Sequence, residues 1–409
     1  MSLADNIEFL RHLPKLTDFK DLSPFARGAR GSTGRLTETT EFGSNPGDLR
    51  MFSFVPADLP KSAGLVVVLH GCTQSAAGYD VGAGWSALAE HYGFALLMPE
   101  QKLSNNANGC FNWFLPEDTT RDSGEAGSIR QMIEQMTRTI GLDRRRIFVT
   151  GLSAGGAMTS AMLAIYPDVF AGGAIIAGLP YGIASNVQEA LKGMFQSPPR
   201  AAAELGDLVR NASAHDGPWP KLSVWHGSAD RTVNPANADE IVKQWLDVHQ
   251  LPAAPMSEAT VDGYPRQIWW NADGETVIES TTITNMAHGT PLGTADNDER
   301  YGAEGAFLIE AGISSSYHIA QFFGLTERIR QPQEGSREKP KESLDRVSPP
   351  ILAPAPERAG KLAPAFTVRA AGDRRSEPRQ QPPRRAIDVS AVITRALTAA
   401  GLIKSGDPT

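Results

Sequence analysis

The stretch FVTGLSAGGAMTSAMLA, residues 148–164, decides the fold, because it reads as an apolar strand, a Gly-Leu-Ser-Ala-Gly turn and a helix of small residues. Glycine costs backbone entropy, so two glycines around one serine indicate a turn that larger residues cannot make. In a G-x-S-x-G turn the serine is strained and its hydroxyl exposed, as a nucleophile requires. Gly151 and Gly155 would remove side chains that clash across this turn, and Ser153 is the candidate nucleophile. The simpler interpretation is a tight turn with a serine cap, and the motif alone leaves both open.

Apolar runs on both sides of this turn predict the rest of the sheet. Further runs of this kind occupy residues 65–72, 93–100, 172–178 and 221–227. Continuous apolar runs suit parallel strands that are buried on both faces. Stretches with helical spacing lie between them, at residues 79–92, 124–141 and 157–167. The alternation predicts an α/β protein with a mostly parallel sheet flanked by helices and joined by right-handed crossovers.

The last part of the predicted domain closes with two strands and a helix. Residues 266–284 predict two strands around an Asp-Gly turn, and residues 315–325 predict a final helix. We therefore expect residues 1–39 to be an N-terminal extension and residues 40–325 to be one domain.

Composition limits the class of protein. The chain has 409 residues, of which 41% are hydrophobic and 21% charged, as in a soluble globular protein with a sizeable core. No apolar run approaches the ~20 residues of a membrane helix, so we expect no membrane insertion. The start, MSLADNIEFLRHLPKL, has no long apolar segment of the kind that secretory signals carry. The default expectation is therefore a cytoplasmic protein.

Charge and proline divide the chain near residue 330. Residues 331–385 hold ten prolines and a net charge of +5, and the first 330 residues carry −12. An acidic body argues against nucleic-acid binding. The proline-rich stretch predicts a disordered linker. Residues 386–403 predict an amphipathic helix, with an apolar stripe that should dock onto a partner or a second copy of the chain.

A nucleophilic serine needs a base, and the base needs a carboxylate that fixes its tautomer. On an α/β-hydrolase scaffold these residues follow in the order Ser, Asp or Glu, His, each just after a strand. Asp230 and His288 match that order and context, with Asp239 as a weaker alternative for the acid. Their simpler interpretations are a turn aspartate and an exposed loop histidine. The joint match favours a catalytic triad of Ser153, Asp230 and His288.

An acyl-transfer site also needs N–H donors for the oxyanion. Ala154, which follows the candidate nucleophile, and Cys72, at the end of the run 65–72 where a loop begins, are the candidates. His70 is expected to hold that loop in place. Trp113 is a candidate for the acyl pocket, although it could equally be core.

Cys72 and Cys110, the two cysteines of the chain, do not form a zinc-ligand pattern. Both are expected in loops at the active-site end of the sheet. A disulfide between them and two buried free thiols are both open possibilities, and a disulfide would indicate an oxidising compartment.

These motifs resemble the poly(3-hydroxybutyrate) depolymerase-type esterases, a family similar to esterases that act on feruloyl and acetyl esters of xylan. The resemblance covers roughly residues 40–325, and its motifs are LHGCTQSAAGYD, NANGCFNWF, GLSAGGAMTSAMLAIYPDVFAGGAIIAG, WHGSADRTVNPAN and MAHGTPLG. It implies the same triad and the same two oxyanion donors. Secreted members of this family have signal peptides, and many depolymerases carry a polymer-binding module, but neither is evident in this sequence. The resemblance therefore implies secretion, against the cytoplasmic default expectation.

The sequence thus predicts a serine esterase that needs no metal or cofactor. The first expectation is hydrolysis of short-chain hydroxyalkanoate esters, as polymer, oligomer or small ester. The alternatives are a feruloyl or acetylxylan esterase and a noncatalytic binding protein on a hydrolase scaffold.

Overall fold

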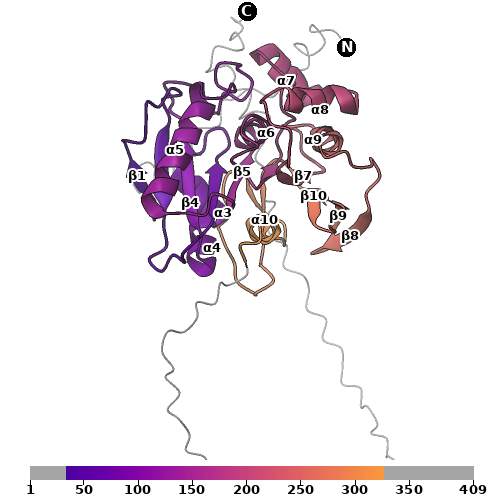
Figure 1. Cartoon of the computed structure of the whole chain (residues 1–409). Coiled ribbons are helices and arrows are strands. Elements are labelled where there is room, and N and C mark those ends of the chain that lie inside the picture. The colour runs from indigo at the N-terminus through magenta and orange to yellow at the C-terminus, as the bar shows by residue number, and fades with distance from the viewer. Residues whose placement is uncertain (1–33, 327–409) are drawn as a thin grey trace, which may run out of the picture. The chain divides into compact units, whose positions relative to one another are not determined.

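A computed structural model describes residues 34–326 of the chain (Figure 1). The predicted linker at residues 331–385 and the predicted helix at residues 386–403 lie outside the described residues. No helix between residues 34 and 326 combines the length and the apolar character needed to cross a membrane.

A ten-stranded sheet forms the centre of the domain. Its strands, in sheet order, are β1 (Thr37–Thr39), β2 (Arg50–Phe54), β4 (Ala95–Glu100), β3 (Leu65–Leu69), β5 (Ile147–Leu152), β6 (Gly172–Ile176), β7 (Lys221–Gly227), β10 (Thr276–Ile283), β9 (Tyr264–Trp270) and β8 (Ser257–Val261). The strands from β4 to β10 run parallel, and the outer strands at both edges are antiparallel. Two short strands, β11 (Thr290–Leu292) and β12 (Leu308–Glu310), pair separately.

Helices cover both faces of the sheet, because the inner strands, such as β3, carry apolar side chains on both faces. Leu65, Val67 and Leu69 point to one buried cluster, while Val66 and Val68 point to the other. Successive side chains of a strand face opposite ways, so this apolar run needs cover on both sides. Each fully buried aliphatic side chain contributes about 1.5–3 kcal/mol.

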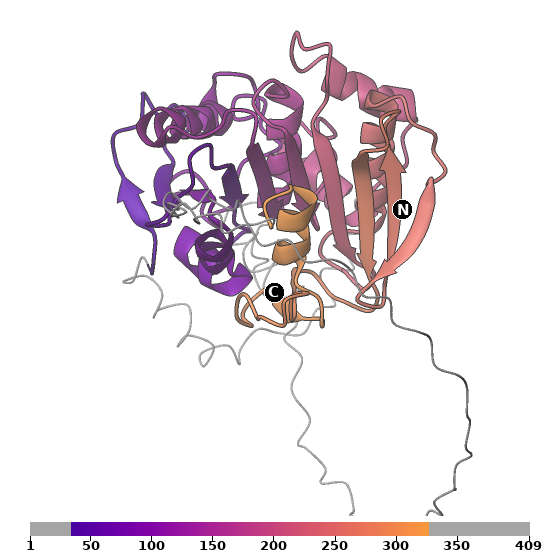
Figure 2. The ribbon, with the colours of Figure 1, turned by 60° about the horizontal axis from the view of Figure 1, so that its bottom comes forward.

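The two sets of helices are distinct (Figures 1 and 2). The first cluster includes residues of α5 (Gly124–Ile140), α6 (Ala154–Ile165), α8 (Ala202–Arg210) and α9 (Ala236–Val248). The second includes residues of α3 (Ala76–Ala83), α4 (Trp85–Tyr92) and α10 (Ser315–Phe322). Figure 2 shows α10 lying against the strands. The remaining helix, α7 (Val187–Gln196), follows β6.

The structure differs from the sequence prediction in three places. The helical stretch at residues 79–92 is divided at Gly84, whose φ is 78° and whose missing Cβ leaves room for the backbone N of Gly302. The sheet begins at β1, a few residues before the domain start predicted at residue 40. The outer strands β1, β2 and β8 have no counterpart in the prediction, because short strands carry a weak periodic pattern. The helices α7 and α8 were not predicted either.

Candidate active site

Ser153 lies at the end of β5, in the turn that leads into α6. Its φ is 57° and its ψ −116°, a strained backbone for a residue with a side chain. The Ser153 N–H donates to the carbonyl of Ile176 at 2.9 Å, which holds the turn in place. The serine is therefore presented in the conformation that the G-x-S-x-G motif predicts.

The two glycines of the motif are required by close backbone contacts. A Cβ on Gly151 would lie 2.4 Å from the carbonyl oxygen of Gly155. A Cβ on Gly155 would lie 2.3 Å from the carbonyl oxygen of Leu69, at the end of the neighbouring strand. Both contacts are with backbone, which cannot move aside as a side chain does. The glycines let α6 begin directly against the ends of β3 and β5.

Asp230 and His288 come together from two neighbouring strands. Asp230 follows β7 and His288 follows β10, and the His288 Nδ1 lies 2.6 Å from the Asp230 Oδ2. Both side chains are buried, with 5% and 4% of their surface exposed. The other carboxylate oxygen, Oδ1, accepts from the N–H groups of Thr232 and Val233 at 2.8 and 2.9 Å. The carboxylate is held from both sides.

Burial of the Asp230 carboxyl acts to raise its pKa, but hydrogen bonds from His226 and His288 outweigh that effect and hold the pKa below its usual range. Asp230 is therefore an anion at neutral pH, as a partner of an imidazolium must be. Asp239, the weaker candidate for the acid, is exposed in the first turn of α9 and has no hydrogen bond to His288.

Ser153 and His288 line one cavity of about 120 Å³. Its walls are mostly apolar and come from the loops after β3, β4, β6 and β7, the end of β5, α7, and the segment before β12. The apolar wall residues are Trp113, Phe114, Leu152, Leu179, Val187, Ala190, Leu191, Met194, Val233 and Phe307.

The candidate oxyanion donors, Cys72 and Ala154, line the same cavity. Within residues 34–326, neither backbone N–H donates to an acceptor. The loop that carries Cys72 is tied down on both sides, because the Gly71 N–H donates to the Gln74 Oε1 and the Thr73 N–H to the carbonyl of Asn108. Two free N–H groups beside Ser153 are the arrangement that stabilises an oxyanion.

Cys72 and Cys110 form a disulfide, with Cα atoms 4.2 Å apart. Of the two possibilities left open by the sequence, the structure has the bonded one. The bond joins the loop after β3 to the loop after β4, directly beside the Cys72 N–H.

His70 lies at the end of β3 and is buried. Its Nδ1 lies 2.8 Å from the carbonyl of Gly71, and its Nε2 lies 3.2 Å from the N–H of Gln101. Because both ring nitrogens bond to backbone, the ring ties the two loops together, as expected for a structural histidine. Burial lowers the pKa of His70, so the ring is neutral.

The aromatic residues of the loop after β4 divide between core and cavity. Phe111 is fully buried and packs on the His70 ring, with centroids 4.9 Å apart. Trp113 and Phe114 both line the cavity and meet edge to face at 5.4 Å. Trp113 also packs partly against the core, so it contributes to both.

Sequence reasoning missed the α7 wall of the cavity and a buried carboxyl beneath the loop after β4. Val187, Ala190, Leu191 and Met194 have the i, i+3, i+4, i+7 spacing of an amphipathic helix, a pattern that could have identified this wall. Glu125 accepts from the N–H of Asn112 at 2.9 Å and from the side chain of Gln101. No local pattern distinguishes this glutamate from a surface one.

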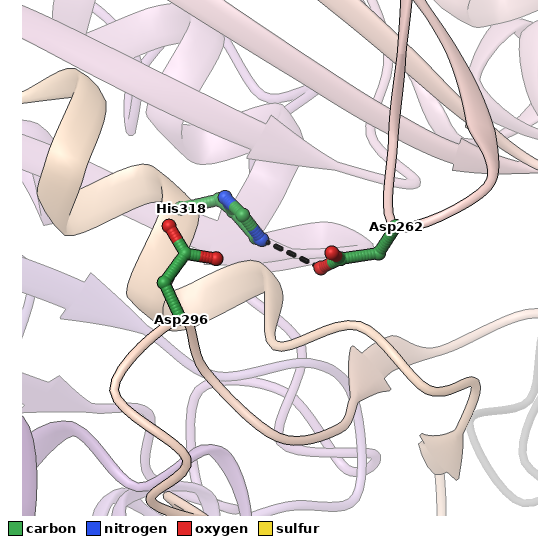
Figure 3. Close-up of side chains that lie close together, drawn as sticks. All are labelled: Asp262, Asp296 and His318. Atoms are coloured by element: carbon green, nitrogen blue, oxygen red, sulfur yellow. Dashed lines mark hydrogen bonds and ion pairs between the residues drawn. The ribbon is translucent and has the colours of Figure 1, made fainter. Parts of the chain in front are cut away.

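A cluster apart from the cavity brings together Asp262, Asp296 and His318, whose potential metal-binding atoms lie within 4.8 Å of one another (Figure 3). His318 is buried and its Nε2 lies 2.9 Å from the Asp262 Oδ2. The two aspartates are exposed. This pairing joins α10 to the turn between β8 and β9, and it needs no metal to do so.

Comparisons with known proteins agree with this architecture. The family model described as "Esterase PHB depolymerase" matches residues 52–260. The poly(3-hydroxyalkanoate) depolymerase C of Paucimonas lemoignei is 46% identical over 291 residues, which cover 71% of this chain and 70% of that protein. The acetylxylan esterase of Coprinopsis cinerea is 32% identical over 265 residues, or 63% of this chain and 70% of that protein.

Among solved structures, an acetyl xylan esterase from Aspergillus awamori superposes with a TM-score of 0.61 at 24% identity and covers 71% of this chain and 100% of its own. This likeness confirms the predicted α/β-hydrolase fold. From the matched family model and the extent of the sequence identity, the chain belongs to the PHB depolymerase family of esterases.

Proposed function

We propose that Ser153, Asp230 and His288 form the catalytic triad of this esterase. The observation that carries the proposal is the 2.6 Å contact between His288 and the buried Asp230, at the same cavity as the strained Ser153. An Asp carboxylate on Nδ1 leaves the Nε2 of the ring as the basic atom, which is the atom that must receive a proton from serine.

The reaction follows from these positions. His288 takes the proton of Ser153 as the serine oxygen attacks the ester carbonyl, and Asp230 stabilises the imidazolium. The N–H groups of Cys72 and Ala154 donate to the oxyanion. His288 then gives the proton to the leaving alcohol, and the acyl-enzyme remains. A water molecule activated by the same histidine hydrolyses it, which releases the acid and restores the serine.

We propose short-chain hydroxyalkanoate esters as the substrate class. The apolar walls of the cavity, built by α7, Trp113, Phe114 and Phe307, support it, because a branched aliphatic acyl group gains affinity from such walls. The cavity volume of about 120 Å³ suits one short acyl unit. The name of the Paucimonas relative, a poly(3-hydroxyalkanoate) depolymerase, is consistent with this class.

A substrate panel tests both proposals. Purified protein is assayed against p-nitrophenyl butyrate, hydroxybutyrate oligomers, amorphous polymer, methyl ferulate and acetylated xylan, with Ser153→Ala as the blank. We expect hydroxybutyrate oligomers to have the highest kcat/KM among the natural esters. Faster hydrolysis of acetylated xylan or methyl ferulate would assign the protein to the alternative substrates.

Ser153→Ala tests the triad itself. Its kcat should fall on the order of 10⁶-fold while the thermal melt stays like that of the wild type. An active Ser153→Ala variant would exclude the serine as nucleophile.

We further propose that the protein works in an oxidising compartment. The Cys72–Cys110 disulfide supports this, because such bonds persist where thiols are not kept reduced. Alkylation of protein from its native source without reductant, followed by mass spectrometry, tests it. Two alkylated cysteines would show that both thiols are free. That result would contradict the proposed oxidising compartment and favour the cytoplasm.

A further inference from the structure

A second histidine contacts the triad carboxylate. His226, at the end of β7, lies with its Nε2 3.2 Å from the Asp230 Oδ2, the same oxygen that meets His288. The same Nε2 lies 3.0 Å from the carbonyl of Val233. Only 3% of the His226 surface is exposed, so these contacts are shielded from water.

The carbonyl contact decides which nitrogen carries the proton. A carbonyl oxygen only accepts hydrogen bonds, so the His226 Nε2 must bear a hydrogen and donate. That hydrogen bonds to the Val233 carbonyl and lies close to the Asp230 carboxylate. His226 thereby links Val233 to Asp230, and its 3.2 Å contact with Oδ2 adds to the hydrogen bonds that Asp230 makes with Thr232, Val233 and His288.

The other ring nitrogen of His226 makes the buried ring energetically unfavourable. Its Nδ1 is buried and has no hydrogen-bond partner among residues 34–326. An unpaired buried polar atom is unfavourable, and an aliphatic side chain of similar size would avoid it. The donor on Nε2 is the property that offsets this cost.

We propose that His226 is a positioning residue for catalysis, which fixes the orientation of the Asp230 carboxylate and so of the His288 ring. This inference rests on the triad proposed above. Among the described residues, Asp239 on α9 also interacts electrostatically with His226. Within residues 34–326, Asp239 has no hydrogen bond to Ser153, Asp230 or His288, so the effect of His226 on catalysis passes through Asp230.

Two substitutions separate the donor from the bulk of the ring. His226→Leu keeps most of the volume and removes the donor. His226→Gln places an amide N–H near the position of Nε2. His249→Leu is the matched control, because His249 also bonds through Nε2 to a backbone carbonyl, that of Pro220 at 3.1 Å, and lies at the far end of α9.

We expect His226→Leu to lower the pH-independent kcat on p-nitrophenyl butyrate roughly 10- to 100-fold, the range for a lost hydrogen bond to a charged group, with KM within twofold. With one donor fewer, the Asp230 carboxylate attracts a positive imidazole more strongly. The acid limb of kcat/KM should therefore move to higher pH by up to about one unit. His226→Gln should recover most of both effects, and His249→Leu should show neither.

A measurement without turnover separates this inference from the proposed function. The protonation of His288 is followed by NMR of labelled histidine in each variant, on the Ser153→Ala background. The midpoint should rise in His226→Leu alone, even if the protein proves inactive on every ester. The inference is overturned if folded His226→Leu keeps the wild-type kcat and midpoint. It is equally overturned if both His226 variants lose kcat alike with no movement of the midpoint, which is the result of a merely structural role.

Discussion

Removing the Cys72–Cys110 disulfide should cost both stability and rate. The bond closes a loop between two cysteines that are 38 positions apart in the sequence. In the chain-entropy model, a loop of that length restricts the unfolded chain by about 4 kcal/mol at 25 °C. The double variant Cys72→Ser with Cys110→Ser should therefore lose about 4 kcal/mol in the free energy of unfolding.

The effect on rate follows from the place of the bond. Loss of a whole oxyanion donor costs about 10²–10³-fold in kcat. In the double variant the N–H of residue 72, the proposed oxyanion donor, remains, and the contacts of Gly71 with Gln74 and of Thr73 with Asn108 still hold the loop. We therefore expect a smaller loss, roughly 10-fold in kcat, with little change in KM.

Urea denaturation followed by tryptophan fluorescence measures the stability, and p-nitrophenyl butyrate measures kcat. Wild-type protein treated with a phosphine reductant should match the double variant, and the reductant should leave the double variant unchanged. A loss below about 1 kcal/mol together with an unchanged kcat would refute the view that this bond holds the oxyanion loop.

Three further perturbations test other parts of the structure. Gly155→Ala places a Cβ 2.3 Å from the Leu69 carbonyl oxygen. The free energy of unfolding, measured by urea denaturation, should therefore fall by about 1–3 kcal/mol or more, and kcat should drop with it. A wild-type kcat would contradict the close contact. Burial, with the nearby charge of Asp118, raises the pKa of Glu125 from its ordinary value of 4.5 to about 8. Between those pH values the folded state therefore keeps a proton that the unfolded chain loses. Stability should then decrease as pH rises through that window, by up to about 5 kcal/mol, and denaturation at several pH values should show a flatter slope for Glu125→Gln. Truncation after residue 330 should leave kcat on a small soluble ester unchanged; an unfolded or inactive product would place the removed segment in the catalytic domain.

Local patterns in the sequence were enough to predict the three residues of the proposed triad. The strand, turn and helix around Ser153 follow from contacts between residues close in the chain, where a glycine or an apolar run has the same consequence in any protein. The order of Ser153, Asp230 and His288 could also be predicted, because each residue follows an apolar run that predicts a strand. Parallel strands end at one edge of the sheet, so residues that follow them are brought near each other.

Tertiary structure alone decided which side chains touch. The bond between Cys72 and Cys110, the cavity wall of α7 and the contact of His226 with Asp230 depend on how loops of different strands pack. His226 lies at the end of an apolar run, and only the folded loop places its Nε2 3.2 Å from the Asp230 carboxylate. Periodicity reports which face of an element is buried, but it does not report the direction or the partner of a polar atom, because hydrogen bonds depend on distances and angles set by the whole fold.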